Sequence, residues 1–135
     1  MRRHIVFAAL VVCILAAFAT PRAEAEMPKD VSIVQLLATP EKFDGKLVRV
    51  FGFLRLAFEG DALYLHREDD AQGLTRNAVW VDRTEAMERE QAKLNAHYVL
   101  VEGMFDAEDT GHMGLFGGAL KKVTRIIPWP PAGSR

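Results

Sequence analysis

The sequence predicts a mainly β fold: a five-stranded antiparallel barrel with one helix before it and one helix between its third and fourth strands. Three observations support this prediction. Five apolar segments of strand character follow one another between residues 46 and 127. One stretch of strong helix formers interrupts them, between the third segment and the fourth. A glycine, Gly52, lies in the middle of the long first segment, where it permits the bend that a closed barrel needs.

The beginning of the chain has the organisation of a secretory signal peptide, for which we expect residues 1–25. Arg2 and Arg3 supply the positive start, and an unbroken apolar run extends over residues 5–18. This run is shorter than the about 20 residues of a spanning helix. Ala23 and Ala25 provide the small residues of a cleavage site after position 25. We therefore expect an exported chain, periplasmic or secreted, without a membrane span after cleavage; an uncleaved N-terminal anchor is the alternative.

Removal of this leader changes the composition of the chain. The 135 residues include 17 basic and 18 acidic ones; without Arg2, Arg3, Arg22 and Glu24 there remain 14 basic and 17 acidic residues, a formal charge of −3. An acidic balance argues against nucleic acid as a partner. Cys13 leaves with the leader, so the mature chain has no thiol for a disulfide, a nucleophile or a thiolate metal site.

Residues 26–45 are predicted to form an N-terminal helical segment. Asp30 is placed to cap a helix over residues 31–38, whose apolar positions make a broad face. Pro40 ends this helix and opens a second, short helical turn. Gly45, directly after an aspartate, indicates the turn into the barrel.

The barrel itself is expected over residues 46–127. Along its first strand the alternate positions from Val48 to Phe58 are apolar or glycine and are expected to face the interior. The helix between the third and fourth strands leans on the body through Met87 and Leu94. The predicted strands cover residues 46–59, 62–66, 78–81, 97–105 and 120–127, the helix covers 85–94, polar loops cover 67–77 and 106–114, and 128–135 form a proline-rich tail.

A helix between the third and fourth strands of a small barrel is the arrangement of the OB-fold. The segments 45–52, 97–103 and 120–126, with their G-x-V-x-V-x-G-like spacing, resemble the strands of small exported bacterial OB-fold proteins, the periplasmic bacterial OB-fold group and the tRNA-anticodon-like OB families. This resemblance implies a ligand-binding module rather than an enzyme, with a cleft flanked by the loops before the second and fifth strands. It gives no functional residue to carry over.

The first candidate site is a predicted outward face of strands one to three, which share the binding face of an OB barrel. Aromatic rings beside guanidinium groups stack on planar or sugar rings. The alternative is that Phe51, Phe53 and Trp80 pack under the N-terminal helix, whose apolar face needs a partner. The candidate ligand-binding residues of this face are Arg49, Phe51, Arg55, Tyr64, His66 and Trp80.

The loop between the last two strands is the second candidate. His112 and Phe116 lie in it and extend the ligand-binding set; the Phe116 region either touches a partner or folds back to plug a barrel end. His66 and His112 also lie near acidic runs, at residues 68–70 and 106–109, which together would suit a divalent ion. Two solvated loops are the alternative.

We therefore expect a non-enzymatic, exported OB-like module that binds a small molecule, an oligosaccharide or an envelope protein, without a cofactor. One alternative is a metal-dependent hydrolase or nuclease that uses His66, His112 and the loop acids. The other is a structural subunit of an envelope assembly, which predicts an apolar surface that stays exposed in the isolated chain.

Overall fold

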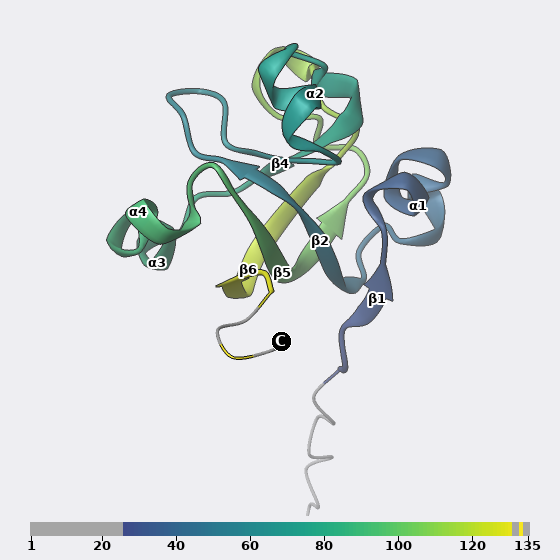
Figure 1. Cartoon of the computed structure of the whole chain (residues 1–135). Helices are drawn as coiled ribbons and strands as arrows, with labels where there is room; N and C mark the ends of the chain where they lie inside the picture. Colours follow the sequence, from purple (N-terminus) through teal and green to yellow (C-terminus); the bar gives the residue numbers. More distant parts are fainter. Residues whose placement is uncertain (1–25, 131–132, 134–135) are drawn as a thin grey trace, which may run out of the picture.

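The computed structural model describes residues 26–130 and residue 133 (Figure 1). It is mainly β and consists of a closed five-stranded barrel, a sixth strand outside the barrel and several short helices. The predicted fold class is therefore confirmed. The prediction of a signal peptide concerns residues 1–25, which lie outside the described residues.

The strands are β1 (Lys29–Val31), β2 (Leu47–Arg55), β3 (Ala62–Tyr64), β4 (Ala78–Val81), β5 (His97–Asp106) and β6 (Ala119–Pro128). The α-helices are α1 (Ile33–Ala38), α2 (Arg67–Ala71), α3 (Glu85–Arg89) and α4 (Gln91–Leu94), and single 3₁₀ turns occupy Pro40–Lys42, Thr75–Asn77 and His112–Gly114.

The barrel closes in the order β2, β3, β4, β6, β5, with β5 pairing back to β2. The β2–β5 ladder is antiparallel and runs from Leu47 opposite Met104 to Leu54 opposite His97. The β4–β6 ladder is parallel and short, so the barrel is mixed rather than wholly antiparallel. This order, with α3 and α4 between β4 and β5, is consistent with an OB-like barrel.

The N-terminal segment differs from the prediction, because a strand precedes its helix. β1 pairs in parallel with β2, so that Asp30 lies in a strand instead of capping α1. The cap is Ser32, whose side chain accepts a hydrogen bond from the backbone N–H of Gln35. A strand of three residues is too short to show a period in the sequence.

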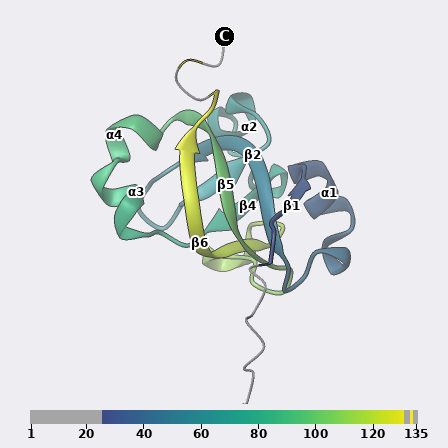
Figure 2. The ribbon, with the colours of Figure 1, turned by 90° about the horizontal axis from the view of Figure 1, so that it is seen from below.

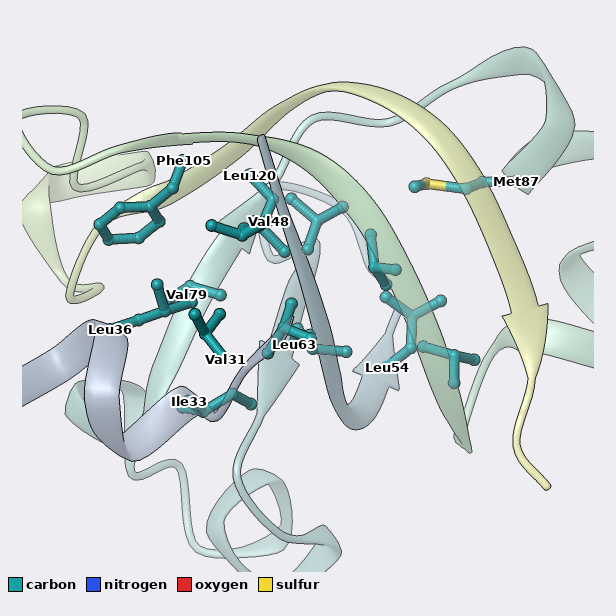
Figure 3. Packing of buried hydrophobic residues seen from close by; sticks show 14 of the residues in the cluster. Val31, Ile33, Leu36, Val48, Leu54, Leu63, Val79, Met87, Phe105 and Leu120 are labelled. Atoms are coloured by element: carbon teal, nitrogen blue, oxygen red, sulfur yellow. The ribbon is translucent and has the colours of Figure 1, made fainter. Parts of the chain in front are cut away.

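The barrel interior is sealed by helices at its two ends. Ile33 and Leu36 of α1 enter one end, while Met87 of α3 packs at the other, as Figure 3 shows. Gly52 makes room for α1, because a Cβ at this position would lie 2.7 Å from Ile33 Cδ1 and from Leu63 Cγ. The predicted contacts of Met87 and Leu94 with the body are confirmed, since both side chains are buried.

Two expectations about the segments between β2 and β4 are wrong. Phe58 was expected inside the barrel, but its side chain is 92% exposed. The reason is that β2 ends at Arg55 and the chain then turns, with a positive φ of 52° at Glu59. Residues 67–77, expected as a loop, contain α2 and a 3₁₀ turn. Asp69 anchors them, because its carboxylate accepts hydrogen bonds from the backbone of His66 and the side chain of Asn77.

Candidate functional site

One part of the predicted binding face lies under other segments of the chain. The outward residues of β3 and β4 belong to a second, smaller buried cluster, which we call the covered face: Phe53, Ala62, Tyr64, Ala78 and Phe116, with Trp80 partly buried against it. The loop between β5 and β6 brings Phe116 to this cluster, where its ring centroid lies 5.5 Å from that of Trp80. Burial raises the pKa of the Tyr64 hydroxyl, and the nearby Asp70 charge adds to this effect.

The cover is not the one that the sequence analysis considered. We expected Tyr64 and Trp80 on an open face, or Phe51, Phe53 and Trp80 under the N-terminal helix. Instead Arg67, at the start of α2, lies over the ring of Phe53 with 5.4 Å between its guanidinium carbon and the ring centroid. The loop from Ala107 to Gly118 lies on Trp80 so closely that a Cβ at Gly111 would be 2.8 Å from the Trp80 side chain. The Phe116 region folds back, although onto the outside of the barrel.

The remaining polar candidates have separate partners. Arg55 forms an ion pair with Asp70 of α2, with 3.1 Å between Nη2 and Oδ2. His66 is exposed at the start of α2, and His112 Nε2 lies 3.5 Å from Glu59 Oε2 across the neighbouring loops. Among residues 26–130 and 133, no three His, Cys, Asp or Glu side chains are grouped as metal ligands.

The other part of the predicted face is open. Figure 2 shows β6, β5, β2 and β1 side by side across the front of the molecule, with helices at the edges of this layer. Three aromatic side chains remain substantially exposed here: Phe51 at 39%, Tyr98 at 37% and Trp129 at 43%. We call the outward residues of this layer, Phe51, Tyr98, Leu100, Ile127 and Trp129, the aromatic face.

The register of the strands assembles the aromatic face. Phe51 lies opposite Leu100 in the β2–β5 ladder, and Leu100 lies opposite Ile127 in the β5–β6 ladder. Leu100 is only 5% exposed although it points away from the barrel, because its neighbours on this face cover it. The Trp129 ring lies 4.5 Å from the Phe51 ring, and the backbone N–H of Trp129 donates to the carbonyl of Tyr98 at 2.8 Å. Phe51 and Tyr98 therefore lie on paired strands, and Trp129 lies directly after the end of β6.

A groove adjoins the aromatic face where two strands end on the same edge of β2. β1 stops at Val31, opposite Val50, and β3 stops at Tyr64, opposite Phe53. The segments that follow β1 and β3 both turn away from the sheet and leave this edge of β2 unpaired at Phe51. The resulting groove has a volume of about 340 Å³ and is lined by Asp30, Val31, Ser32, Ile33, Gln35, Phe51 and Leu65.

Charged side chains flank the aromatic face. Arg49 Nε donates to Glu102 Oε1 at 2.7 Å, and Arg125 Nη1 donates to the same oxygen at 3.2 Å. The hydrogen bond from Arg49 to Glu102 raises the pKa of the Arg49 guanidinium. Arg49 also pairs with Asp30. Arg67 lies at the Tyr98 end of this face, where α2 continues with Glu68, Asp69 and Asp70.

Two further polar clusters hold loops in place. Arg83 donates two hydrogen bonds to the carboxylate of buried Asp61, which also accepts from the backbone N–H of Ala57. This clamp lines a pocket of about 360 Å³ beside Phe58. On the other side of the barrel, Lys121 bridges two carboxylates at the start of the β5–β6 loop, Asp106 and Asp109.

Sequence reasoning missed Tyr98 and Trp129. The signal for Tyr98 is that both alternating sets of positions in residues 97–101 are largely apolar, which indicates a strand with both faces in contact with other groups. Trp129 was assigned to the tail because prolines surround it. Its ring contact with Phe51 and its backbone hydrogen bond to Tyr98 place it on the aromatic face, directly after β6.

In comparisons with known proteins, no protein-family model, no curated protein and no solved structure matches the chain. Within residues 26–130 and 133, no helix is long and apolar enough to cross a membrane. The barrel and its surface are therefore the basis on which function is inferred.

Proposed function

We propose that this chain is an exported, non-enzymatic OB-like module that binds a protein partner through the aromatic face. The observation that carries the proposal is the set of three exposed aromatic rings beside an apolar groove: Phe51 and Tyr98 on paired strands and Trp129 directly after β6. Contiguous apolar surface of this kind is typical of interaction sites. It also agrees with the expectation that an assembly subunit keeps an apolar surface exposed.

The residue types favour a protein partner. Tyrosine, tryptophan, phenylalanine and arginine are enriched in protein interfaces, and a few such residues carry most of the binding energy. Polar groups at the rim, with an apolar centre, match the usual anatomy of such an interface. Here Leu100 and Ile127 lie in the apolar centre, while Arg49, Glu102 and Arg125 lie at its rim.

The ring geometry is less suited to an oligosaccharide. The planes of Phe51 and Trp129 are inclined by 58°, so the two rings do not form one flat platform for a sugar ring. The rings of Phe53 and Tyr98 are inclined by 68°. The contacting, inclined rings form an uneven apolar surface, which suits the side chains of a polypeptide better than the flat face of a sugar ring.

The test is a selection from a phage-displayed library of short random peptides, with the mature protein as the immobilised target. We expect enriched peptides whose binding is lost in Phe51→Ser. Phe58→Ser is the matched control, because it removes an equally aromatic and more exposed ring from the β2–β3 loop. The melting temperature of each variant is measured, so that lost binding is not confused with unfolding.

Enrichment of no peptide, or binding that is equal in Phe51→Ser and the wild type, would refute the proposal. Two parallel measurements identify other ligands of the same face. Binding to arrayed oligosaccharides that requires Phe51 would assign the face to sugars instead. Self-association in analytical ultracentrifugation that Phe51→Ser abolishes would make the partner a second copy of this chain.

A further inference from the structure

A row of alternating charges crosses the open layer of strands at one end of the aromatic face. Asp30 of β1 lies opposite Arg49 of β2. Arg49 lies opposite Glu102 of β5, and Glu102 lies opposite Arg125 of β6. Each neighbouring pair in this row is an ion pair, with nitrogen–oxygen distances of 3.2, 2.7 and 3.2 Å. We call these four residues the charged row, whose signs from β1 to β6 are negative, positive, negative and positive.

The charged row has no net charge, so a partner of uniform sign would meet as many like charges as opposite ones. The surface that fits it carries the same alternation in reverse order. The ends of the row are its accessible part, because the side chain of Asp30 is 75% exposed and that of Arg125 is 51% exposed, whereas that of Glu102 is 12% exposed. The partner must therefore offer a base and an acid about 14 Å apart, the width of three strand spacings.

The next row along the strands is apolar, with a hollow at one end and an aliphatic side chain at the other. Phe51, Leu100 and Ile127 lie opposite one another on β2, β5 and β6. β1 contributes no residue to this row, because it stops at Val31, opposite Val50, and the groove of about 340 Å³ lies there instead. From the β1 side to β6 the row therefore consists of a hollow, a phenylalanine, a leucine and an isoleucine.

A two-fold axis that runs parallel to the strands, between β2 and β5, makes both rows complementary to themselves. It lays the layers of two copies face to face and reverses the order of the strands, so that β1 meets β6 and β2 meets β5 of the second copy. Asp30 then faces Arg125 of the second copy, and Arg49 faces its Glu102. In the apolar row, Ile127 of the second copy faces the groove. An axis at right angles to the strands would instead bring each charge against its own counterpart or against the apolar row.

We propose that the partner of the aromatic face is a second copy of this chain, bound in a two-fold dimer whose axis runs parallel to β2 and β5. The inference rests on the proposed function and specifies its partner. A second copy supplies the reversed charge order and a side chain for the groove without any further assumption about its sequence. The dimer covers the apolar row and places the charged row at its rim, which is the usual anatomy of an interface.

The test is sedimentation equilibrium of the mature protein and of two charge reversals, over a range of protein concentrations. The wild type should form a reversible dimer. Asp30→Arg alone places two bases against each other at both ends of the charged row, and Arg125→Asp alone does the same with two acids. Each variant should therefore dimerise at least about tenfold more weakly than the wild type.

An equimolar mixture of the two variants should recover the dimer, because each reversed charge then faces its opposite in a heterodimer. This recovery separates a lost contact from a lost fold, since a misfolded variant would not be rescued by the other. Arg76→Asp is the matched control, because it reverses an exposed arginine between α2 and β4, away from the aromatic face. It should dimerise as the wild type does, whereas Phe51→Ser should be a monomer.

A wild type that stays monomeric, or a mixture that dimerises no better than either variant alone, would overturn the inference. Peptides from the random library that need Phe51 compete with the second copy, so they should dissociate the wild-type dimer. Peptides that bind through Phe51 to a monomeric wild type, or to a dimer that they leave intact, would overturn the dimer and yet leave the proposed function standing.

Discussion

The covered face and the aromatic face both consist of outward-pointing aromatic and aliphatic residues of the barrel strands, yet the first is buried and the second is exposed. Phe53 and Phe51 are neighbouring outward residues of β2; Phe53 is 3% exposed and Phe51 is 39% exposed. The difference comes from the segments that succeed the neighbouring strands. After β3 the chain forms α2 over the outward side, and after β5 a long loop folds Phe116 onto it, whereas β5 and β6 leave their outward side open.

This comparison separates two roles of an outward aromatic residue on a barrel. Where a loop returns, the residue becomes part of a second core, and the face that OB barrels use for ligands is filled by the chain itself. Where no segment returns, the residue remains available to a partner. The loops therefore determine which outer side of the barrel is exposed, and in this molecule the exposed side is formed by β2, β5 and β6.

The largest effect is expected for a charge placed on the inner rather than the outer side of β2. Val50→Asp should prevent folding, because Val50 is fully buried in the barrel and an unpaired carboxylate there has no partner. Phe51→Asp, one residue further on, should fold. Far-UV circular dichroism and thermal unfolding of the two variants test this. A Val50→Asp variant with wild-type melting would show that the inner and outer sides of β2 are wrongly assigned.

The next effect distinguishes the two outer faces directly. Phe116→Ala should lower the free energy of unfolding by about 3–5 kcal/mol, as expected for a buried phenylalanine. Phe51→Ala should lower it by less than about 1 kcal/mol, because the ring is already partly in water. Urea unfolding at neutral pH measures both. Similar losses for the two variants would remove the distinction between a covered and an open face.

A smaller effect concerns the loop that covers the outer face, and it depends on pH. Backbone N–H donors and Lys121 lower the pKa of Asp106, and Lys121 with the N–H of Gly111 lowers the pKa of Asp109. This stabilisation is complete above the unfolded aspartate pKa of about 3.9 and is lost as the pH falls through the lower folded values. Acidification below about pH 4 should therefore loosen the loop and shift Trp80 emission to longer wavelength.

The control is Lys121→Met, which removes the ammonium group shared by the two carboxylates. We expect its stability to fall less steeply than that of the wild type between neutral pH and acid, since part of the stabilising contact is already absent. Parallel pH profiles of unfolding for the two proteins would mean that Lys121 does not hold the loop.

The smallest effect is a difference in tryptophan fluorescence quenching, which is measured on the folded protein. Trp129, 43% exposed on the aromatic face, should be quenched by iodide more readily than Trp80, which is partly buried against Phe116 under the β5–β6 loop. Trp80→Phe and Trp129→Phe variants isolate the two signals. Stronger quenching of Trp80 would indicate that the covered face opens in solution.

Much of the fold was predictable because it depends on local alternation of residues. The position of β4 was predicted without error, and the inward residues of β2 and Leu56 directly after it were assigned correctly. Met87 and Leu94 were predicted as the contacts of the helices with the barrel. β1 and α2 were missed, because three and five residues are too few to establish a period. The turn after Arg55, which exposes Phe58, is set by tertiary packing around Asp61 and Arg83.

The candidate site was predictable only in part, for a related reason. Alternation identified Arg49 and Phe51 as outward, and both lie at the open face. Alternation does not show which outward residues another segment covers, so Tyr64 and Trp80 were placed on a face that the chain fills. It also does not show which distant strands become neighbours, and this is what brings Tyr98 and Trp129 beside Phe51.

The insertion of Ile33 and Leu36 of α1 into one end of the barrel also constrains the order in which the segments can fold during synthesis. Ile33 and Leu36 emerge early, but the walls that receive them include Val79, Phe105 and Leu120, the last of which comes more than eighty residues later. Because synthesis proceeds from the N-terminus, the apolar side of this helix has no finished cavity to enter until almost the whole chain has appeared. This early segment is therefore among the last to reach its final place, and its two large aliphatic side chains stay outside a finished core in the meantime.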